Sequence, residues 1–416
     1  MPSLSRTPSR WRYAAIVGPV NAMHAAATTN LFIVFPCSRV NGDVVPQSML
    51  RIPDTTLGDA ILAPSRARSV LDSICLDHKT LTPYAKDGAM IRHSRLLAVG
   101  SLMAIPGILC AETHRLAPQQ FHNTFSAAHA PVMRVRPGDR VVTKTVDAGG
   151  TDWDGKAVAT GPNPQTGPFY VEGAAPGDTL IVKIEKLETN RATAFSSSLL
   201  APYTVDPASL ATRVDRDPAR VTWRINKTTA MVRVDTRGIV PDGLELPLRP
   251  MLGCIGVAPA RKETIATSTP GAFGGNMDYA GMTAGVTVML PVYEPGALLF
   301  IGDAHARQGE GEVSGTGLET SMDVEFSVDL VKGKTIGWPR LETDTHFIVL
   351  GSARPLLEAL QHATSEMQRW LVADHGFSER GAATFMGQAL EYEIANVVDP
   401  SFTVAAKVRK SQLPRK

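Results

Sequence analysis

The sequence predicts an α+β protein that is mainly β, with a barrel- or sandwich-like β body and a helical C-terminal section. Three observations support this. The chain of 416 residues holds 30 prolines and 35 glycines, which favours many turns between strands over long helices. Short alternating apolar runs fill the middle of the chain, and helical spacing dominates only after residue 352. Runs of strands followed by helices are typical of the α+β class.

A recurring turn marks the predicted strands. Pro-Gly dipeptides at 137–138, 176–177 and 295–296 each precede an apolar run suited to a strand. Residues 222–234 and 243–259 predict further strands. Residues 324–351 alternate between apolar and polar side chains, which predicts a hairpin with its turn at Lys332 and Gly333.

Two helices are expected near the C-terminus. Residues 353–376 carry apolar side chains at roughly helical spacing and end at Gly376. Residues 378–399 predict a second helix, for which Ser378 supplies an N-cap hydroxyl.

The N-terminal part has a different character. Residues 90–111 begin with basic side chains, continue with an apolar run too short to span a bilayer, and end in small residues, which is the layout of a secretory signal peptide. We therefore expect translation to start at Met90, residues 1–89 to be a non-native or disordered extension, and residues 112–416 to form the folded functional domain. The mature protein would then be periplasmic or secreted; without that start it would be cytoplasmic.

Composition and motifs exclude several functions. The formal charge of +2 gives no reason to expect a nucleic-acid partner, and no stable membrane insertion is expected. Cys254, flanked by apolar residues, is interpreted as a buried hydrophobe, not a nucleophile. The chain holds no Gly-x-Ser-x-Gly elbow and no phosphate-binding or dinucleotide-binding glycine motif.

The strongest site candidate is the stretch LFIGDAHARQGEGEVSGTGLET, residues 299–320. Asp303 and His305 lie two apart at a predicted strand end, so their side chains point to the same face, and a carboxylate with an imidazole suits zinc or a similar divalent ion. The glycine-rich loop that follows would bring Glu312 beside the bound water as a general base. By itself the pattern also fits a solvated turn.

Further polar residues in glycine-bounded loops are weaker candidates. His122, Asp147, Asn276 and Asp278 each have a surface or turn-forming interpretation as the alternative. Glu172 falls within an apolar run, where an unpaired carboxylate would be costly.

Taken together, TGPFYVEGAAPGDTLIVKI, RPMLGCIGVAPA, GGNMD, LPVYEPGALLFIGDAHARQGEGEVSGTGLE and VDLVKG resemble the acetamidase/formamidase family over residues 120–400. The resemblance implies hydrolysis of small linear amides to a carboxylate and ammonia, a divalent metal (zinc first), a β-rich fold and a homo-oligomer. The family's H-x-x-W, aspartate-glycine and G-D-x-H-A segments fall on residues 122–125, 147–150 and 302–306. Phe125 replaces the family's tryptophan and Glu310 a common aspartate, and export would be unusual.

The resemblance completes the predicted site. The expected metal ligands are His122, Asp147, Asp303 and His305. Glu312 is the expected general base, with Glu172 as a second catalytic carboxylate. The residues expected to bind substrate or support the ligands are Asn276, Asp278, Phe125 and Gln308. The alternatives are hydrolysis of a γ-lactam or a larger acyl amide, or a non-catalytic exported binding protein on the same fold.

Overall fold

A computed structural model describes residues 111–213 and 218–414, together with four short strands between residues 32 and 51. The chain divides into two compact units, residues 1–103 and 104–416. The described strands of the first unit form two pairs, β1 (Phe32–Ile33) with β4 (Leu50–Arg51) and β2 (Ser38–Val40) with β3 (Asp43–Val45). The predicted signal peptide and start at Met90 lie outside the described residues, except for Ala111.

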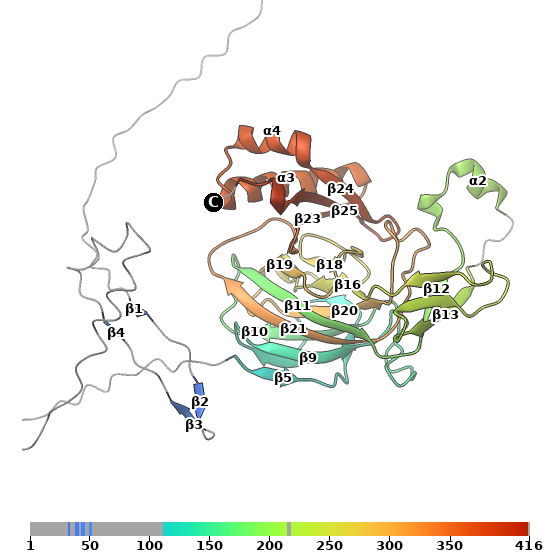
Figure 1. Cartoon of the computed structure of the whole chain (residues 1–416), viewed down its shortest axis with the longest axis horizontal. Coiled ribbons are helices and arrows are strands. Elements are labelled where there is room, and N and C mark those ends of the chain that lie inside the picture. Colours follow the sequence, from blue (N-terminus) through green and yellow to red (C-terminus); the bar gives the residue numbers. More distant parts are fainter. Residues whose placement is uncertain are drawn as a thin grey trace, which may run out of the picture. The chain divides into compact units, whose positions relative to one another are not determined.

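The second unit is mainly β, as predicted, and contains a nine-stranded sheet (Figure 1). The strands of this sheet, in spatial order, are β24 (Glu391–Asn396), β25 (Phe402–Arg409), β23 (His346–Ala353), β22 (Arg340–Glu342), β19 (Thr287–Pro291), β11 (Thr179–Thr189), β21 (Met322–Val331), β9 (Arg140–Thr145) and β5 (Thr113–Arg115). The predicted Pro-Gly turns are confirmed, because β9, β11 and β20 (Leu299–His305) each begin shortly after one of them.

A six-stranded sheet packs against it. Its strands are β18 (Gly274–Asn276), β16 (Met251–Gly256), β20, β10 (Gln165–Val171) and β6 (Phe121–His122), with β8 (Met133–Val135) also paired to β10. A separate pair joins β7 (Thr124–Phe125) to β17 (Ile265–Ala266). One hydrophobic core contains side chains from both large sheets, such as Phe169 and Phe326, whose rings meet edge to face at 5.3 Å. The sandwich-like body is therefore confirmed.

A four-stranded arm extends from this body, at the right of Figure 1. It comprises β12 (Thr193–Ser197), β13 (Arg220–Asn226), β14 (Met231–Val234) and β15 (Glu245–Pro247), with α2 (Pro207–Thr212) between the first two. A small core joins Trp223 and Val232 of the arm to Ala306 and Leu318, which flank the glycine-rich loop after β20. The arm thus packs against the loop predicted to carry the site.

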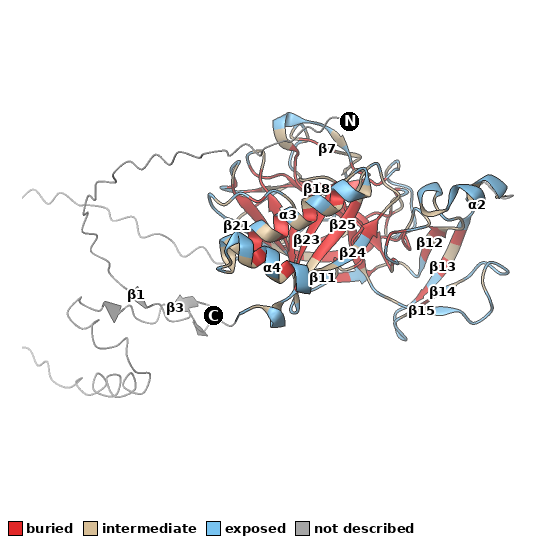
Figure 2. Cartoon of the chain, turned by 90° about the horizontal axis from the view of Figure 1, so that it is seen from above, coloured by how far each residue is buried: buried red, intermediate tan, exposed pale blue. Residues whose placement is uncertain are grey.

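Two helices cover one end of the nine-stranded sheet, as predicted (Figure 2). They are α3 (Leu356–Asp374) and α4 (Glu379–Ala389), and Ser378 accepts a hydrogen bond from the Gly381 N–H as the expected N-cap. A buried ion pair of Arg340 with Glu366 ties α3 to β22. The part of the chain that the structure describes also contains three short 3₁₀ turns, η2 (Pro202–Thr204), η3 (Ala260–Lys262) and η4 (Lys410–Gln412). Within residues 111–213 and 218–414, no helix is both long and apolar enough to cross a membrane.

Two predicted elements are wrong. Residues 324–351 do not form the predicted hairpin around Lys332 and Gly333, because β21 pairs along its length with β11 and β9, while β22 pairs with β19 and β23. The second helix ends at Ala389, and residues 391–396 form strand β24. In this strand Glu391 and Glu393 alternate with Tyr392 and Ile394, which is the two-residue period of a strand.

Candidate metal centre and active site

The Asp303 and His305 side chains converge at the end of β20. Every residue of this strand is buried, including both polar side chains. Asp303 has a left-handed backbone with φ of 52°, which breaks the regular alternation of the strand. Its Oδ2 lies 3.5 Å from His305 Nε2. The D-x-H spacing therefore brings the two groups together, as the sequence predicts.

Gln308 fixes the orientation of the His305 ring. The Gln308 amide nitrogen donates to the backbone carbonyl of Asp278 at 2.6 Å, so its oxygen must face the ring. That oxygen accepts from His305 Nδ1 at 2.8 Å. The proton of a neutral ring is therefore held on Nδ1, and the Nε2 lone pair faces the carboxylates. This is the arrangement expected of a histidine that ligates a metal.

Glu319 is the residue that the sequence analysis missed. Its carboxylate is buried, and Oε1 lies 3.0 Å from His305 Nε2 and accepts the Gly317 N–H at 3.0 Å. The backbone of Glu319 exchanges two hydrogen bonds with Phe195 of β12, so the arm holds it in place. Asp303, His305 and Glu319 each offer a ligand atom, and these atoms lie within 4.8 Å of one another.

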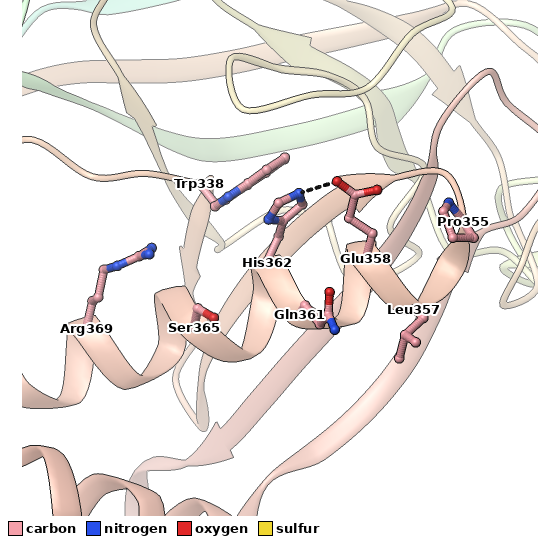
Figure 3. A pocket seen from close by; sticks show the side chains of 8 residues that line it. All are labelled: Trp338, Pro355, Leu357, Glu358, Gln361, His362, Ser365 and Arg369. Carbon is pink, nitrogen blue, oxygen red and sulfur yellow. Dashed lines mark ion pairs between the residues drawn. The ribbon is translucent and has the colours of Figure 1, made fainter. Parts of the chain in front are cut away.

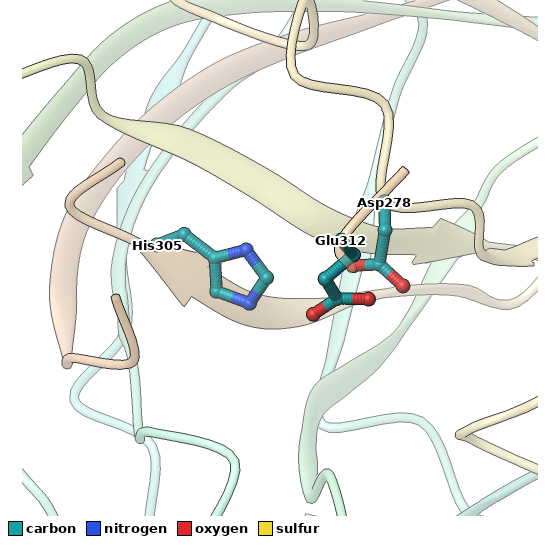
Figure 4. Close-up of side chains that lie close together, drawn as sticks. All are labelled: Asp278, His305 and Glu312. Carbon is teal, nitrogen blue, oxygen red and sulfur yellow. The ribbon is translucent and has the colours of Figure 1, made fainter. Parts of the chain in front are cut away.

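A second group shares the same histidine (Figure 4). Asp278, His305 and Glu312 offer ligand atoms within 4.8 Å of one another, and all three side chains are buried. Asp278 and Glu312 both have left-handed backbones, with φ of 44° and 49°. Such conformations cost free energy for residues other than glycine and are concentrated at functional sites.

The β24–β25 connection closes this side of the cluster. Asn396 donates to the Asp399 carboxylate at 2.9 Å, and Asn276 donates to Asp278 and to Asp399 at 2.8 Å each. Gly311 donates its N–H to the carbonyl oxygen of Ile394 at 2.8 Å, so the loop that carries Glu312 is bonded to β24. Neither Asn396 nor Asp399 was predicted from the sequence as a site residue.

The cluster concentrates negative charge. Burial raises the pKa of Asp278 and of Glu312, and the neighbouring carboxylates raise both further. Burial likewise raises the pKa of Asp399, to about 7. Burial would lower the pKa of His305, but Glu319 and Asp303 raise it well above its usual value. Among the described residues, no lysine or arginine forms an ion pair with these carboxylates.

These residues fit a divalent cation. Three buried atoms of the cluster have no hydrogen-bond partner: Asp278 Oδ1, His305 Nε2 and Glu319 Oε2. Buried polar atoms without partners are costly. A cation held by Asp303, His305 and Glu319 would give His305 Nε2 a partner and offset the excess negative charge. Carboxylates with one imidazole form a ligand set used for zinc and other divalent ions.

Two glycines leave the space that the cluster occupies. A Cβ on Gly253 would lie 2.3 Å from Asp278 Oδ1 and 2.5 Å from Asp303 Oδ2. A Cβ on Gly317 would lie 2.3 Å from His305 Nδ1. Neither glycine has a left-handed backbone, so both positions require glycine for close approach and not for a turn.

Comparison with known proteins identifies the family. The model of the acetamidase/formamidase family matches residues 111–269 and 260–404, which together span most of the chain. The chain belongs to the acetamidase/formamidase family.

Solved structures of acetamidases resemble the chain over most of their length. The acetamidase of Yersinia enterocolitica is 30% identical with a TM-score of 0.64, and the match covers 74% of this chain and 95% of that one. The acetamidase of Bacillus halodurans is 30% identical with a TM-score of 0.61, covering 71% and 97%. Among curated relatives, the acetamidase of Mycolicibacterium smegmatis is 40% identical over 68 residues, which span only 16% of this chain and 17% of that protein.

The structure does not bring every predicted site residue of the acetamidase/formamidase motifs into the cluster. His122 belongs to neither group of candidate ligands; its ring stacks on His129 at 4.0 Å, and burial with His129 lowers its pKa. Asp147 also lies outside both groups. Its Oδ1 accepts the N–H groups of Gly149 and Thr151, and its Oδ2 pairs with Arg191 at 2.6 Å, so it caps a turn.

Glu172 and Phe125 are two further predicted site residues. Glu172 lies just after β10 in an exposed turn, 3.5 Å from Arg134, so its carboxylate is not buried in an apolar strand. Phe125 is fully buried and packs against Phe273 and Phe300 in the main hydrophobic core. Neither residue belongs to the cluster. Cys254 is buried, as predicted, and burial raises the pKa of its thiol.

The surface groove beside α3 is separate from this centre (Figure 3). It measures about 410 Å³ and is lined by side chains such as Trp338, whose ring stacks on His362 at 4.3 Å. None of the residues of the acidic cluster lines it. The buried cluster is therefore the better active-site candidate of this acetamidase/formamidase family member.

Proposed function

We propose that this protein hydrolyses a small linear amide, of the formamide or acetamide type, to a carboxylate and ammonia with a bound divalent cation, zinc being the first choice. The observation that carries the proposal is the buried cluster itself. It combines His305 with carboxylates that no lysine or arginine neutralises within the described residues, and it keeps buried atoms without partners. Family membership supports amide hydrolysis as the reaction class.

Asp303, His305 and Glu319 would hold the cation. When bound, the cation would polarise the amide carbonyl and lower the pKa of a water molecule towards about 7. Gln308 would keep His305 Nε2 free for this task by holding the proton on Nδ1. The positive charge would also offset the carboxylate repulsion that raises the pKa of Glu312.

Glu312 would move the proton. Its carboxylate would accept the proton of the attacking water and deliver it to the departing nitrogen. An amide requires this delivery because an amide anion is a poor leaving group. Asn276 and Asn396 donate hydrogen bonds to the carboxylates of Asp278 and Asp399, and these bonds would keep the two carboxylates in fixed positions. The small exposed area of the cluster would restrict entry to small substrates.

A direct assay tests this function. Ammonia release from formamide, acetamide and a γ-lactam is measured with the full chain, with and without a chelator. We expect turnover of the linear amides and its loss on chelation. His305→Ala should lose bound metal and turnover together, whereas His362→Ala, in the groove beside α3, should keep both. Full turnover by a metal-free His305→Ala protein would exclude the proposal, and preference for the lactam would assign the alternative reaction.

We further propose that the protein is a homo-oligomer and is exported after cleavage near Ala111. Light scattering coupled to size-exclusion chromatography tests the first point, and a monomer would refute it. N-terminal sequencing of the natural product tests the second, and a mature chain that retains residues before Met90 would refute it.

A further inference from the structure

Buried amide side chains form a hydrogen-bonded row that leads to the acidic cluster. The row contains Gln165, Asn163 and Asn276, whose exposed fractions are 0%, 4% and 6%. Gln165 donates to Asn163 Oδ1 at 2.7 Å, and Asn163 in turn donates to Asn276 Oδ1. Asn163 has a left-handed backbone with φ of 51°, which directs its side chain along the row. In such a row, the nitrogen of each amide must donate to the oxygen of the next, so all of the amides are oriented the same way.

The carboxylates set that direction. Asn276 donates its amide nitrogen to Asp278 and Asp399, so its oxygen must accept from Asn163. The Asn163 amide nitrogen is thereby engaged, and its oxygen must accept from the Gln165 amide nitrogen. Gln165 also donates to the Asn163 backbone carbonyl at 3.1 Å. The remaining atom, Gln165 Oε1, is fixed as a hydrogen-bond acceptor.

Gln165 Oε1 is buried and has no hydrogen-bond partner. It lies against Gly302, the residue directly before Asp303, since a Cβ on Gly302 would approach it to 2.6 Å. On the other side of β10, Gln165 is the register partner of His122 in β6, whose buried Nε2 also lacks a partner. Register partners on neighbouring antiparallel strands place their side chains on the same face. An acceptor and an imidazole nitrogen are thus both unsatisfied at this face of the sheet.

We infer that Gln165 Oε1 accepts an N–H of the substrate's –NH₂ group and makes the site selective for unsubstituted amides. This inference rests on the proposed amidase function. The hydrogen bonds of its nitrogen prevent the Gln165 amide from flipping, so only its oxygen faces the substrate. This acceptor favours a substrate nitrogen that carries N–H. It disfavours an N,N-dialkyl amide, which has no N–H to donate. The neighbouring His122 Nε2 is available as a second polar contact for the same small group.

A surface groove lies close to this histidine. It measures about 520 Å³ and is lined by His129, whose ring stacks on His122. His129 is itself held by Thr124, whose hydroxyl oxygen lies 2.7 Å from its Nε2. The stacked pair therefore joins a residue of the groove to the register partner of Gln165.

The test compares formate release from formamide and from N,N-dimethylformamide, with the second compound also measured as a competitive inhibitor. In Gln165→Met we expect kcat/KM for formamide to fall at least about tenfold, while N,N-dimethylformamide reacts or binds as well as before or better. Gly302→Ala, which pushes the Gln165 amide aside without replacing it, should shift the preference in the same direction. The matched control is Gln361→Met, on the exposed face of α3, and it should behave as the wild type.

The outcomes separate the two proposals. If the wild type releases formate but Gln165→Met keeps its preference for formamide, the role of Gln165 is wrong and the amidase function stands. A parallel loss for both compounds would also overturn the role, because it would show structural damage only. If the metal-loaded wild type releases no formate or acetate from the simple amides, the proposed function itself fails. Thermal unfolding of each variant shows whether it is folded.

Discussion

Gly253→Ala offers a sharp test of the cluster because it changes no polar group. Gly253 lies in β16 with an ordinary backbone, so alanine fits the main chain there. Its Cβ, however, would lie 2.3 Å from Asp278 Oδ1 and 2.5 Å from Asp303 Oδ2. Ordinary carbon–oxygen contacts begin well above 3 Å, so both carboxylates would have to move by roughly 1 Å.

The size of the effect follows from this displacement. A shift of about 1 Å in catalytic groups lowers the rate by about 100-fold, which corresponds to about 2.7 kcal/mol of transition-state stabilisation. Metal affinity should fall by a similar factor because Asp303 is a proposed ligand. Overpacking should also lower the free energy of unfolding by about 1–3 kcal/mol.

The assay measures kcat/KM for formamide, bound metal by mass spectrometry and thermal unfolding. Gly309→Ala, in the glycine-rich loop after β20, is the matched control, because its Cβ would meet no atom within 4 Å. Gly253→Ala with metal affinity and kcat/KM within threefold of the wild type would refute the placement of the Asp278 and Asp303 carboxylates against the Cβ position of Gly253.

Gly317, Glu319 and Asp139 provide three further tests. Gly317→Ala should displace the His305 ring, because the new Cβ would lie 2.3 Å from His305 Nδ1. A metal titration should then show metal affinity lowered by about 10- to 100-fold, and unchanged affinity would contradict the prediction. Glu319→Gln should lower metal affinity at least about tenfold. In the metal-free protein it should also lower the pKa of His305, followed by NMR, because Glu319 raises that pKa. An unshifted titration of His305 would be evidence against the pair. Burial would raise the pKa of Asp139, but hydrogen bonds, among them one with His114, lower it to about 2. This stabilisation is present above the unfolded pKa and is lost as pH falls from about 4 to about 2, so Asp139→Asn should cost about 2 kcal/mol of unfolding free energy at pH 7 and nothing near pH 2, measured by urea unfolding.

Local signals predicted the body of the fold, and long-range pairing limited the prediction. Pro-Gly turns are fixed by the conformation of two residues, so the strands after them could be located from sequence. The partner of β21 could not be located in this way. β21 pairs with β11, and not with β22, the next strand in sequence, because β21 and β11 match over a long register. Residues 391–396 were assigned to a helix because the helical pattern before them hid a short alternating run.

The candidate site was predictable only where its residues are close in sequence. Asp303 and His305 are two apart on one strand and their side chains converge as predicted, although the left-handed backbone of Asp303 departs from regular strand geometry. Glu319 carries no such spacing signal, because β12 of the arm holds it beside His305. Asp399 likewise comes from the β24–β25 connection. Residues far apart in sequence meet in this cluster through tertiary pairing. Local patterns in one sequence do not reveal which segments pair.

The bond between Gly311 and β24 also determines when the cluster can form. The loop that carries Glu312 depends on Ile394 and Ala395, which follow far later in the chain. On the ribosome, this loop therefore cannot make its final contacts until β24 has been synthesised. A chain that ends before β24 would lack the backbone bonds that hold the loop of Glu312.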